Sequence, residues 1–317
     1  MPAAPVHKAG EMSDEQQKDI GRGVSAALGA YVMWGLFPLM FRALEAVPST
    51  LIVAHRIIWS LFFVYAILYF QKRLGEVWAA MRDPRTLLTI FAATLFLSVN
   101  WLVYVWSVET GQVLATSFGY YINPLVNVLL GMVFLGERQN RQQWVAIAIA
   151  AAAVALQAQA IGGLPWISLT LAGTFGVYGF IRKTVNVRSS PGLAVETLVL
   201  FPFAIGYAVY SASEIGTGFY TDPWSMFWLI ATGPATAGAL MFFAYGARQL
   251  RLTTIGMIQY LAPSMQFLIA VFLFHEEINA VRLISFALIW MSLVVYTHDS
   301  LRQRRKRRLE REIVTDG

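Results

Sequence analysis

The chain has 317 residues, of which 57% are hydrophobic and only 13% charged, with a net charge of +6. A soluble protein carries about 25% charged residues to cover its surface. This composition, with a mean hydropathy of +0.56, therefore excludes a soluble domain and indicates that lipid is the solvent for most of the chain. The sequence contains no cysteine, which excludes a disulfide framework and thiol chemistry.

Residues 1–22 are polar and contain no apolar core, so they are predicted to be a cytoplasmic tail and not a cleavable signal peptide. Beyond this tail, long apolar stretches alternate with short charged loops. Because a bilayer core about 30 Å thick requires roughly 20 apolar residues per helix, the sequence predicts an all-α membrane protein with ten transmembrane helices. The predicted spans are 23–42, 50–70, 86–107, 112–135, 141–159, 164–184, 193–211, 224–247, 253–274 and 279–297.

Lysine and arginine are concentrated in alternate loops, which the positive-inside rule assigns to the cytoplasm. The opposite loops offer only Arg42 and Arg282, both at helix edges, so both termini are predicted to be cytoplasmic. The basic tail at 302–308 has no interleaved aromatic residues, which favours an orientation signal in contact with anionic lipid over a nucleic-acid arm. The cations of the alternate loops are Lys72, Arg73, Arg82, Arg85, Arg138, Arg141, Arg182, Lys183, Arg188, Arg248 and Arg251.

Residues 112–137 and 251–276 read as two copies of one segment. At a constant offset of 139 residues, Tyr121, Pro124 and Glu137 correspond to Tyr260, Pro263 and Glu276. Two halves of five spans each must start on opposite sides of the membrane, so 23–159 and 164–297 are predicted to form two inverted repeats, followed by a basic cytoplasmic tail at 298–317. Proteins built in this way place a substrate site near mid-membrane and expose it alternately to the two sides.

Ionisable residues deep in a span are functional candidates, because burying them in the membrane is costly. Arg56 in the second span and Glu196 in the seventh could face one cavity, with Arg56 attracting an anionic group and Glu196 an ammonium group. Alternatively, Arg56 and Glu196 pair with each other, or their side chains snorkel to the interface. His55 could serve proton coupling, or it could simply be hydrogen-bonded within its helix.

Polar and aromatic residues form further candidates for the substrate pathway. Asn100 and Trp101 combine an amide with a ring, a pair that suits a ligand with a polar end and an apolar body. The two prolines, Pro124 and Pro263, are predicted to break their helices and to take part in gating, since each frees a backbone carbonyl. The alternative for the amides is that they cross-link helices. The remaining candidates are Tyr120, Tyr121, Asn123, Asn127, Tyr178, Gln259 and Tyr260, whereas Glu109 is interpreted as a solvated loop charge.

Other chemistry is not indicated by the sequence. It has no phosphate-binding Gly-x-x-x-x-Gly-Lys-Ser/Thr loop, so ATP is not the predicted energy source. It has no His-Glu-x-x-His motif and no Cys/His cluster, so an enzyme, a metal site and a bound cofactor are not predicted. The expected partners are a small-molecule substrate, the lipid bilayer and, as one option, a coupling proton.

The motifs resemble the drug/metabolite transporter superfamily, specifically EamA-type proteins of the RarD family. The resemblance covers about residues 22–297 and rests above all on the segment from Ser117 to Asn127, with its Asn-Pro pair. Shorter matches are the stretch His55 to Trp59, Asn100-Trp101, Tyr178 to Lys183, Glu196-Thr197, Arg251 to Gly256 and Gln259-Tyr260. The resemblance implies ten helices with cytoplasmic termini in a bacterial inner membrane, duplicated EamA domains, and transport, usually efflux, of small organic metabolites. Related members export amino acids.

Two functions remain open from the sequence. The first is a secondary transporter that exports amino acids or similar metabolites by alternating access. The second is a non-transporting receptor or lipid-handling scaffold that uses the same cavity for binding alone.

Overall fold

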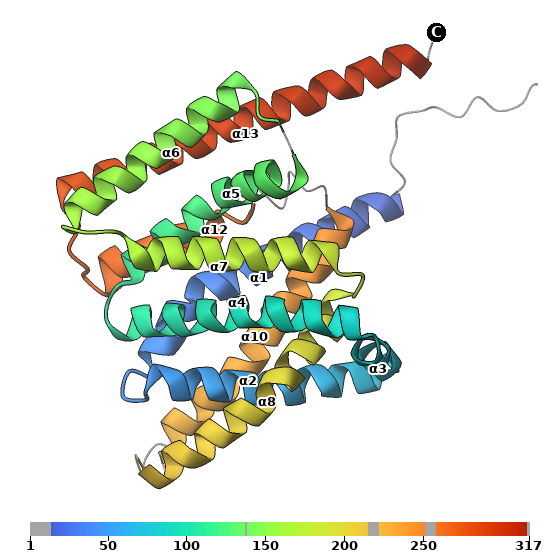
Figure 1. Ribbon diagram of the computed structural model, residues 1–317, viewed down its shortest axis with the longest axis vertical. Helices are drawn as coiled ribbons and strands as arrows, with labels where there is room; N and C mark the ends of the chain where they lie inside the picture. Colours follow the sequence, from blue (N-terminus) through green and yellow to red (C-terminus); the bar gives the residue numbers. More distant parts are fainter. Residues whose placement is uncertain (1–13, 137, 215–221, 251–257, 316–317) are drawn as a thin grey trace, which may run out of the picture.

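The computed structural model describes residues 14–136, 138–214, 222–250 and 258–315, and in this part of the chain the regular secondary structure is helical, without strands (Figure 1). The helices are α1 (Asp14–Arg42), α2 (Ser49–Phe70), α3 (Leu74–Arg82), α4 (Pro84–Glu109), α5 (Val113–Leu135), α6 (Arg141–Ala160), α7 (Trp166–Thr184), α8 (Ser189–Glu214), α10 (Pro223–Gln249), α12 (Leu261–Leu268) with the π-helical turn η1 (Ile269–Leu273), and α13 (Ala280–Thr315).

Each predicted span coincides with one of these helices, which confirms the all-α membrane class. Within the described residues, eight helices are long and apolar enough to cross a membrane. The other two predicted spans correspond to α7 and to the shorter apolar helix Leu261–Leu273. At 1.5 Å per residue, this shorter helix is about 20 Å long, less than the hydrocarbon core. The first part of its predicted span, 253–257, lies outside the described residues. The count of ten spans therefore stays a prediction.

Two boundaries differ from the sequence-based expectation. The short helix α3 (Leu74–Arg82) occupies a segment predicted to be a loop. Helix α13 does not end near residue 297 but continues as one helix of 36 residues through the basic tail to Thr315. Hydropathy locates only the part of a helix that contacts lipid, so it cannot show how far a helix extends into water.

The helices pack in pairs formed by segments that are far apart in sequence. Helices α6 and α13 lie side by side at one edge of the bundle, α2 and α8 at the opposite edge, and α4, α5 and α7 between them (Figure 1). Helix α1 packs on α10 and α12, and α7 packs on α4 and α5. The main core cluster includes the fully buried rings of Phe41, Phe118 and Phe286. Each helix pair named in this paragraph joins the first half of the chain to the second.

Helix α1 contains a proline that leaves one carbonyl without its helical partner. Pro38 has no N–H, so the carbonyl of Trp34 cannot accept the usual bond within α1. The side-chain amide of Gln266 in α12 donates to this carbonyl at 3.1 Å. Gln266 therefore acts as a cross-link between helices, the alternative considered for these amides.

Replacing Gln266 with leucine is expected to destabilise the protein by about 1–3 kcal/mol, because the buried carbonyl of Trp34 then has no donor. In a Pro38→Ala background the same change should cost much less, since the introduced alanine supplies its own N–H to that carbonyl. Thermal unfolding of the four purified proteins measures this coupling. Equal costs in both backgrounds would contradict the assignment.

Carboxylates cap several helix starts. Asp83 accepts bonds from the backbone N–H groups of Arg85 and Thr86 at the start of α4, and Asp222 does the same for Trp224 and Ser225 at the start of α10. The Thr86 hydroxyl lowers the pKa of Asp83 from its ordinary value, and the Ser225 hydroxyl that of Asp222. Pro84 and Pro223 follow the two aspartates. These Asp-Pro caps stand 139 residues apart, the offset of the tyrosine–proline repeat.

Two further carboxylates hold helix starts from a distance. Glu276 accepts from the N–H groups of Val113 and Leu114 at the start of α5, at 2.5 and 2.9 Å. Glu109 accepts from the N–H of Ser49 at the start of α2, at 3.2 Å. Glu109 is thus half-buried and caps a helix, which corrects its interpretation as a solvated loop charge. Glu137 lies outside the described residues.

Candidate functional site

Arg56 of α2 is buried in the middle of the bundle, with 4% of its surface exposed. Its Nε donates to the Thr236 hydroxyl of α10 at 2.7 Å. Its guanidinium carbon lies 4.4 Å from the ring centroid of Trp101 and 5.3 and 5.7 Å from those of Phe37 and Phe41. Helices α1, α2, α4 and α10 thus enclose one cation with aromatic faces, which attract it by about 2 kcal/mol or more where water is excluded.

Two hydrogen-bond donors in this cluster are buried without partners. They are Nη1 of Arg56 and the hydroxyl of Tyr104. The Tyr104 ring packs against Phe41, 5.9 Å between centroids, and against Tyr120 at 5.8 Å. Both tyrosines lie within electrostatic range of Arg56. Orphaned buried donors are rare in native structures, and each requires an explanation.

Asn100 lies beside this cluster and links α4 to its neighbours. Its amide nitrogen donates to the carbonyl of Leu171 at 3.1 Å and to the hydroxyl of Thr174 at 3.0 Å, both in α7. Its amide oxygen accepts from the Tyr120 hydroxyl at 3.4 Å. Asn100, Trp101 and Tyr120 therefore lie close to Arg56.

Glu196 of α8 is buried, but it does not pair with Arg56. Its Oε1 forms an ion pair with Nε of Arg182 at 3.3 Å, and its Oε2 accepts from the Tyr178 hydroxyl at 3.3 Å. The Arg182 guanidinium lies over Gly192, where an added Cβ would stand 2.3 Å from both Nη atoms. The alternative in which Glu196 pairs with Arg56 is therefore excluded in this structure. Arg182, counted above as a loop cation, is instead the partner of Glu196.

His55 is buried one position before Arg56, with 7% of its surface exposed. The indole N–H of Trp59, one turn later in α2, donates to its Nδ1 at 3.3 Å. His55 is therefore hydrogen-bonded within its own helix, which was one of the two possibilities for it.

The repeated tyrosines meet in space. The rings of Tyr121 and Tyr260 stack at an interplanar angle of 21°, with centroids 6.3 Å apart. The hydroxyls of Tyr121 and Ser264 are 2.6 Å apart, and Ser117 of α5 donates to the carbonyl of Pro263 at 2.8 Å. This contact joins α5 to α12 at equivalent positions of the two repeat segments.

The other candidates around the prolines are dispersed. Helix α5 runs through Pro124 without interruption, and Pro263 lies in the first turn of α12. Asn123 is half-buried near Gly176 of α7, Asn127 is exposed, and Gln259 is half-buried. The structure does not gather these residues around Arg56.

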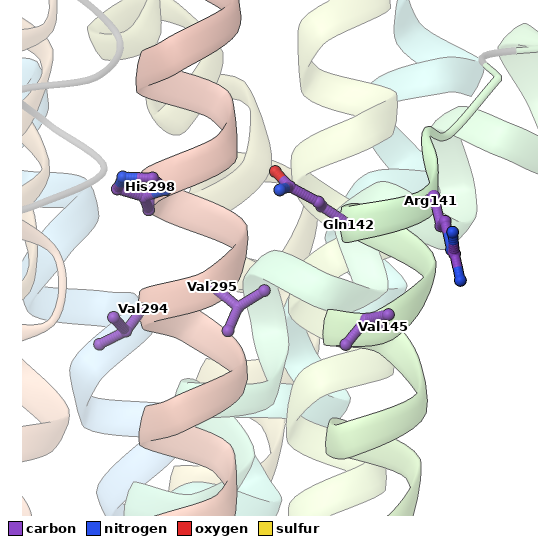
Figure 2. A pocket seen from close by; sticks show the side chains of 6 residues that line it. All are labelled: Arg141, Gln142, Val145, Val294, Val295 and His298. Atoms are coloured by element: carbon purple, nitrogen blue, oxygen red, sulfur yellow. The ribbon is translucent and has the colours of Figure 1, made fainter.

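Two crevices lie away from this cluster. One, of about 540 Å³, runs between α6 and α13; Val145 and Val295 face each other across it, while Arg141 and His298 point to opposite sides (Figure 2). The other, of about 400 Å³, lies beside Glu276 and Trp166. None of the predicted site residues lines either crevice. Within the described residues, no group of three or more His, Cys, Asp or Glu side chains could hold a metal ion.

Sequence and structure comparisons place this chain among known proteins. Residues 21–158 match the model of the EamA-like transporter family. The chain is 43% identical over 291 residues to the "Uncharacterized transporter PA0485" of Pseudomonas aeruginosa, covering 91% of this chain and 97% of that protein. It is 36% identical over 290 residues to "Protein RarD" of Escherichia coli, covering 91% and 98%. A solved crystal structure shares the fold, with a TM-score of 0.58 at 17% identity over 89% of this chain and 99% of that one.

These relatives, the eight long apolar helices of the described residues and the buried polar cluster together define a membrane transporter of the drug/metabolite type. The chain belongs to the RarD family of EamA-like transporters.

Proposed function

We propose that this protein is a secondary transporter that exports small organic metabolites, amino acids among them, by alternating access. The observation that carries the proposal is the buried cluster around Arg56, to which both halves of the chain contribute. Phe37, Arg56 and Trp101 come from residues 23–159, and Thr236 comes from residues 164–297. A polar site between two halves is where rocking of one half against the other would expose a substrate to either side.

The pattern of helix packing supports the inverted repeat. Exchanging the halves maps α1 on α7, α2 on α8, α4 on α10, α5 on α12 and α6 on α13. Under this exchange the α1–α10 interface corresponds to the α7–α4 interface, and the α5–α7 interface corresponds to the α12–α1 interface. The interfaces α2–α8, α5–α12 and α6–α13 correspond to themselves, and all of these interfaces are present in the structure. The Asp-Pro caps and the stacked tyrosines add equivalent positions. We take the loop cations to place both termini in the cytoplasm, in a bacterial inner membrane.

We assign His55, Asn100 and Tyr120, with Arg56 and Trp101, to the substrate pathway. We assign the α5–α12 contact at Tyr121 and Tyr260 to gating, together with the two repeated prolines, Pro124 and Pro263. Asn123, Asn127 and Gln259 are secondary candidates, because they lie close in sequence to these prolines. Glu196 and Tyr178 form a second buried polar group on α7 and α8. A carboxylate that exchanges one partner for another is a suitable relay for a coupling proton.

The test is flux in proteoliposomes containing the purified full-length chain. We expect the protein to exchange labelled small metabolites across the vesicle membrane and the Arg56→Ala variant to lose this exchange. The control is Arg302→Ala, which replaces an exposed arginine of α13 and should transport at the wild-type rate. A proton gradient imposed across the vesicles shows whether flux is coupled to it. Binding of a ligand without flux in either direction would refute transport and favour a receptor.

A further inference from the structure

The environment of Arg56 indicates which chemical group the transported molecule carries. A buried cation is normally balanced by a carboxylate, because an isolated charge in a low-dielectric interior is costly. Among the described residues, Arg56 has no acidic partner: the ion pairs there involve Arg42, Arg73, Arg182 and Arg188. The protein thus supplies the positive half of an ion pair, one hydroxyl acceptor and three aromatic faces.

The two orphaned donors specify what is missing. Nη1 of Arg56 and the hydroxyl of Tyr104 both donate, and both are buried without an acceptor. Tyr104 has 3% of its surface exposed, so water does not replace that acceptor freely. A carboxylate matches this pair, since it has two oxygens that each accept hydrogen bonds and it forms strong charge-assisted bonds with a guanidinium.

The number of charges selects among anions. One guanidinium balances one negative charge, whereas a phosphate monoester carries about −1.5 to −2 near neutral pH and would leave buried charge in excess. The surroundings are rings: Phe37, Phe41 and Trp101 face the guanidinium, and Tyr104 and Tyr120 stand beside it. The body of the ligand that fits these surroundings is therefore apolar.

The charges around Arg56 and Glu196 do not favour a substrate that must carry an ammonium group. Glu196, the carboxylate that the sequence suggested as its receiver, already forms an ion pair with Arg182 and accepts a hydrogen bond from Tyr178, although its Oε1 accepts no hydrogen bond among the described residues. A zwitterion bound at Arg56 would bring a cation into a region whose own charge is positive. The ammonium group of an amino acid thus gains no acidic partner beside Arg56 within the described part of the protein.

We propose that Arg56 and Tyr104 bind the carboxylate of a monocarboxylate with an apolar body, and that the site does not need an amino group on that substrate. This assignment rests on the proposed function, because it names the substrate class of the same site. Tyr104 is a new member of the site, since it was not among the site residues predicted from the sequence.

The test compares ligands that share one body and differ in one group. The probes are L-phenylalanine, L-3-phenyllactate, which has a hydroxyl in place of the ammonium, and L-phenylalaninamide, which lacks the carboxylate. A panel of other carboxylates, each with its amide, covers different bodies. Binding to the full-length protein in detergent is measured as ligand-dependent thermal stabilisation. We expect phenyllactate to bind at least as tightly as phenylalanine, and each carboxylate at least tenfold more tightly than its amide.

Two variants locate the effect. Arg56→Met should reduce carboxylates to the affinity of their amides. Tyr104→Phe removes only an orphaned hydroxyl, so it should fold normally yet bind carboxylates about tenfold more weakly, the factor expected for a hydrogen bond to a charged group. Tyr69→Phe, at an exposed tyrosine of the same helix as Arg56, is the matched control and should bind like the wild type.

The inference is overturned if amides bind as well as carboxylates, if phenylalanine binds more than tenfold more tightly than phenyllactate, if Tyr104→Phe leaves carboxylate affinity unchanged, or if no carboxylate in the panel binds. Carboxylate binding without flux would sink the proposed transport but support this assignment. Flux of amines or neutral molecules without a preference for carboxylates would support the proposed transport but refute this assignment.

Discussion

Substitution of Gly233 by alanine is expected to force α10 away from α2 and to destabilise the protein severely. A Cβ at this position would stand 2.4 Å from both the carbonyl carbon and the Cβ of Trp59, and 2.7 Å from the backbone nitrogen of Ser60. These atoms belong to or adjoin the backbone of α2, so they cannot rotate away and the helices must separate. Overpacking of this kind costs about 1–3 kcal/mol, more than the roughly 0.5–1 kcal/mol that alanine gains over glycine in a helix.

The same separation should disable the site. Thr236 lies one turn after Gly233 and holds the guanidinium of Arg56 at 2.7 Å, and Ser60 donates to the Gly233 carbonyl at 3.3 Å. The control is Gly238→Ala in the same helix, where the nearest atom is the Met33 methyl group at 3.6 Å. Thermal unfolding and proteoliposome flux of both variants measure the effect. Equal effects of Gly233→Ala and Gly238→Ala on stability and flux would contradict the close contact between α2 and α10 at Gly233.

Loss of Arg182 should destabilise the protein far more than loss of Arg56, although Arg56 is the more deeply buried. Arg182→Met leaves the buried carboxylate of Glu196 without its ion-pair partner, and breaking a buried pair from one side costs about 3–5 kcal/mol. Arg56→Met orphans no acidic group among the described residues. It gives up three aromatic contacts and one hydrogen bond but also relieves the desolvation of a cation, so we expect a small net change.

The double variant Arg182→Met with Glu196→Gln separates charge from packing. It removes both charges together, so most of the lost stability should return, and a double-mutant cycle built on thermal or denaturant unfolding gives the coupling. Gly192→Ala is an independent check, since its Cβ would displace the Arg182 guanidinium without altering any charge. The Arg182–Glu196 pair would be contradicted if the effects of Arg182→Met and Glu196→Gln on the free energy of unfolding were additive. It would also be contradicted if Arg56→Met and Arg182→Met lost equal stability.

The sequence predicted where the helices lie, because apolar runs between charged loops are a local signal. It also identified Tyr121 and Tyr260 as equivalent residues, and the structure stacks them. A second marker of the repeat was visible and was missed: Asp83-Pro84 and Asp222-Pro223, at the same offset of 139. The helix α3 was missed for a different reason, since it is too short and too polar to register as a span.

The partners of the charged residues could not be predicted in the same way. Arg182 stands at the end of an apolar run and was counted as a loop cation; only the tertiary structure shows that it turns back over Gly192 to reach Glu196. Tyr104 was one aromatic residue among many until its buried hydroxyl was found to be unpaired. Glu276 was identified only as the counterpart of Glu137, yet the helix that it caps begins 163 residues earlier in the chain, at Val113.

Helix α13 is longer than the membrane is thick. At 1.5 Å per residue its 36 residues extend about 54 Å, against a hydrocarbon core of about 30 Å. Its final turns therefore form a charged rod that projects beyond the lipid. A tilt of about 10° at the packed end moves the far end of such a rod by roughly 9 Å. This helix amplifies small rearrangements of the bundle into displacements that a spectroscopic label near Arg302 can report.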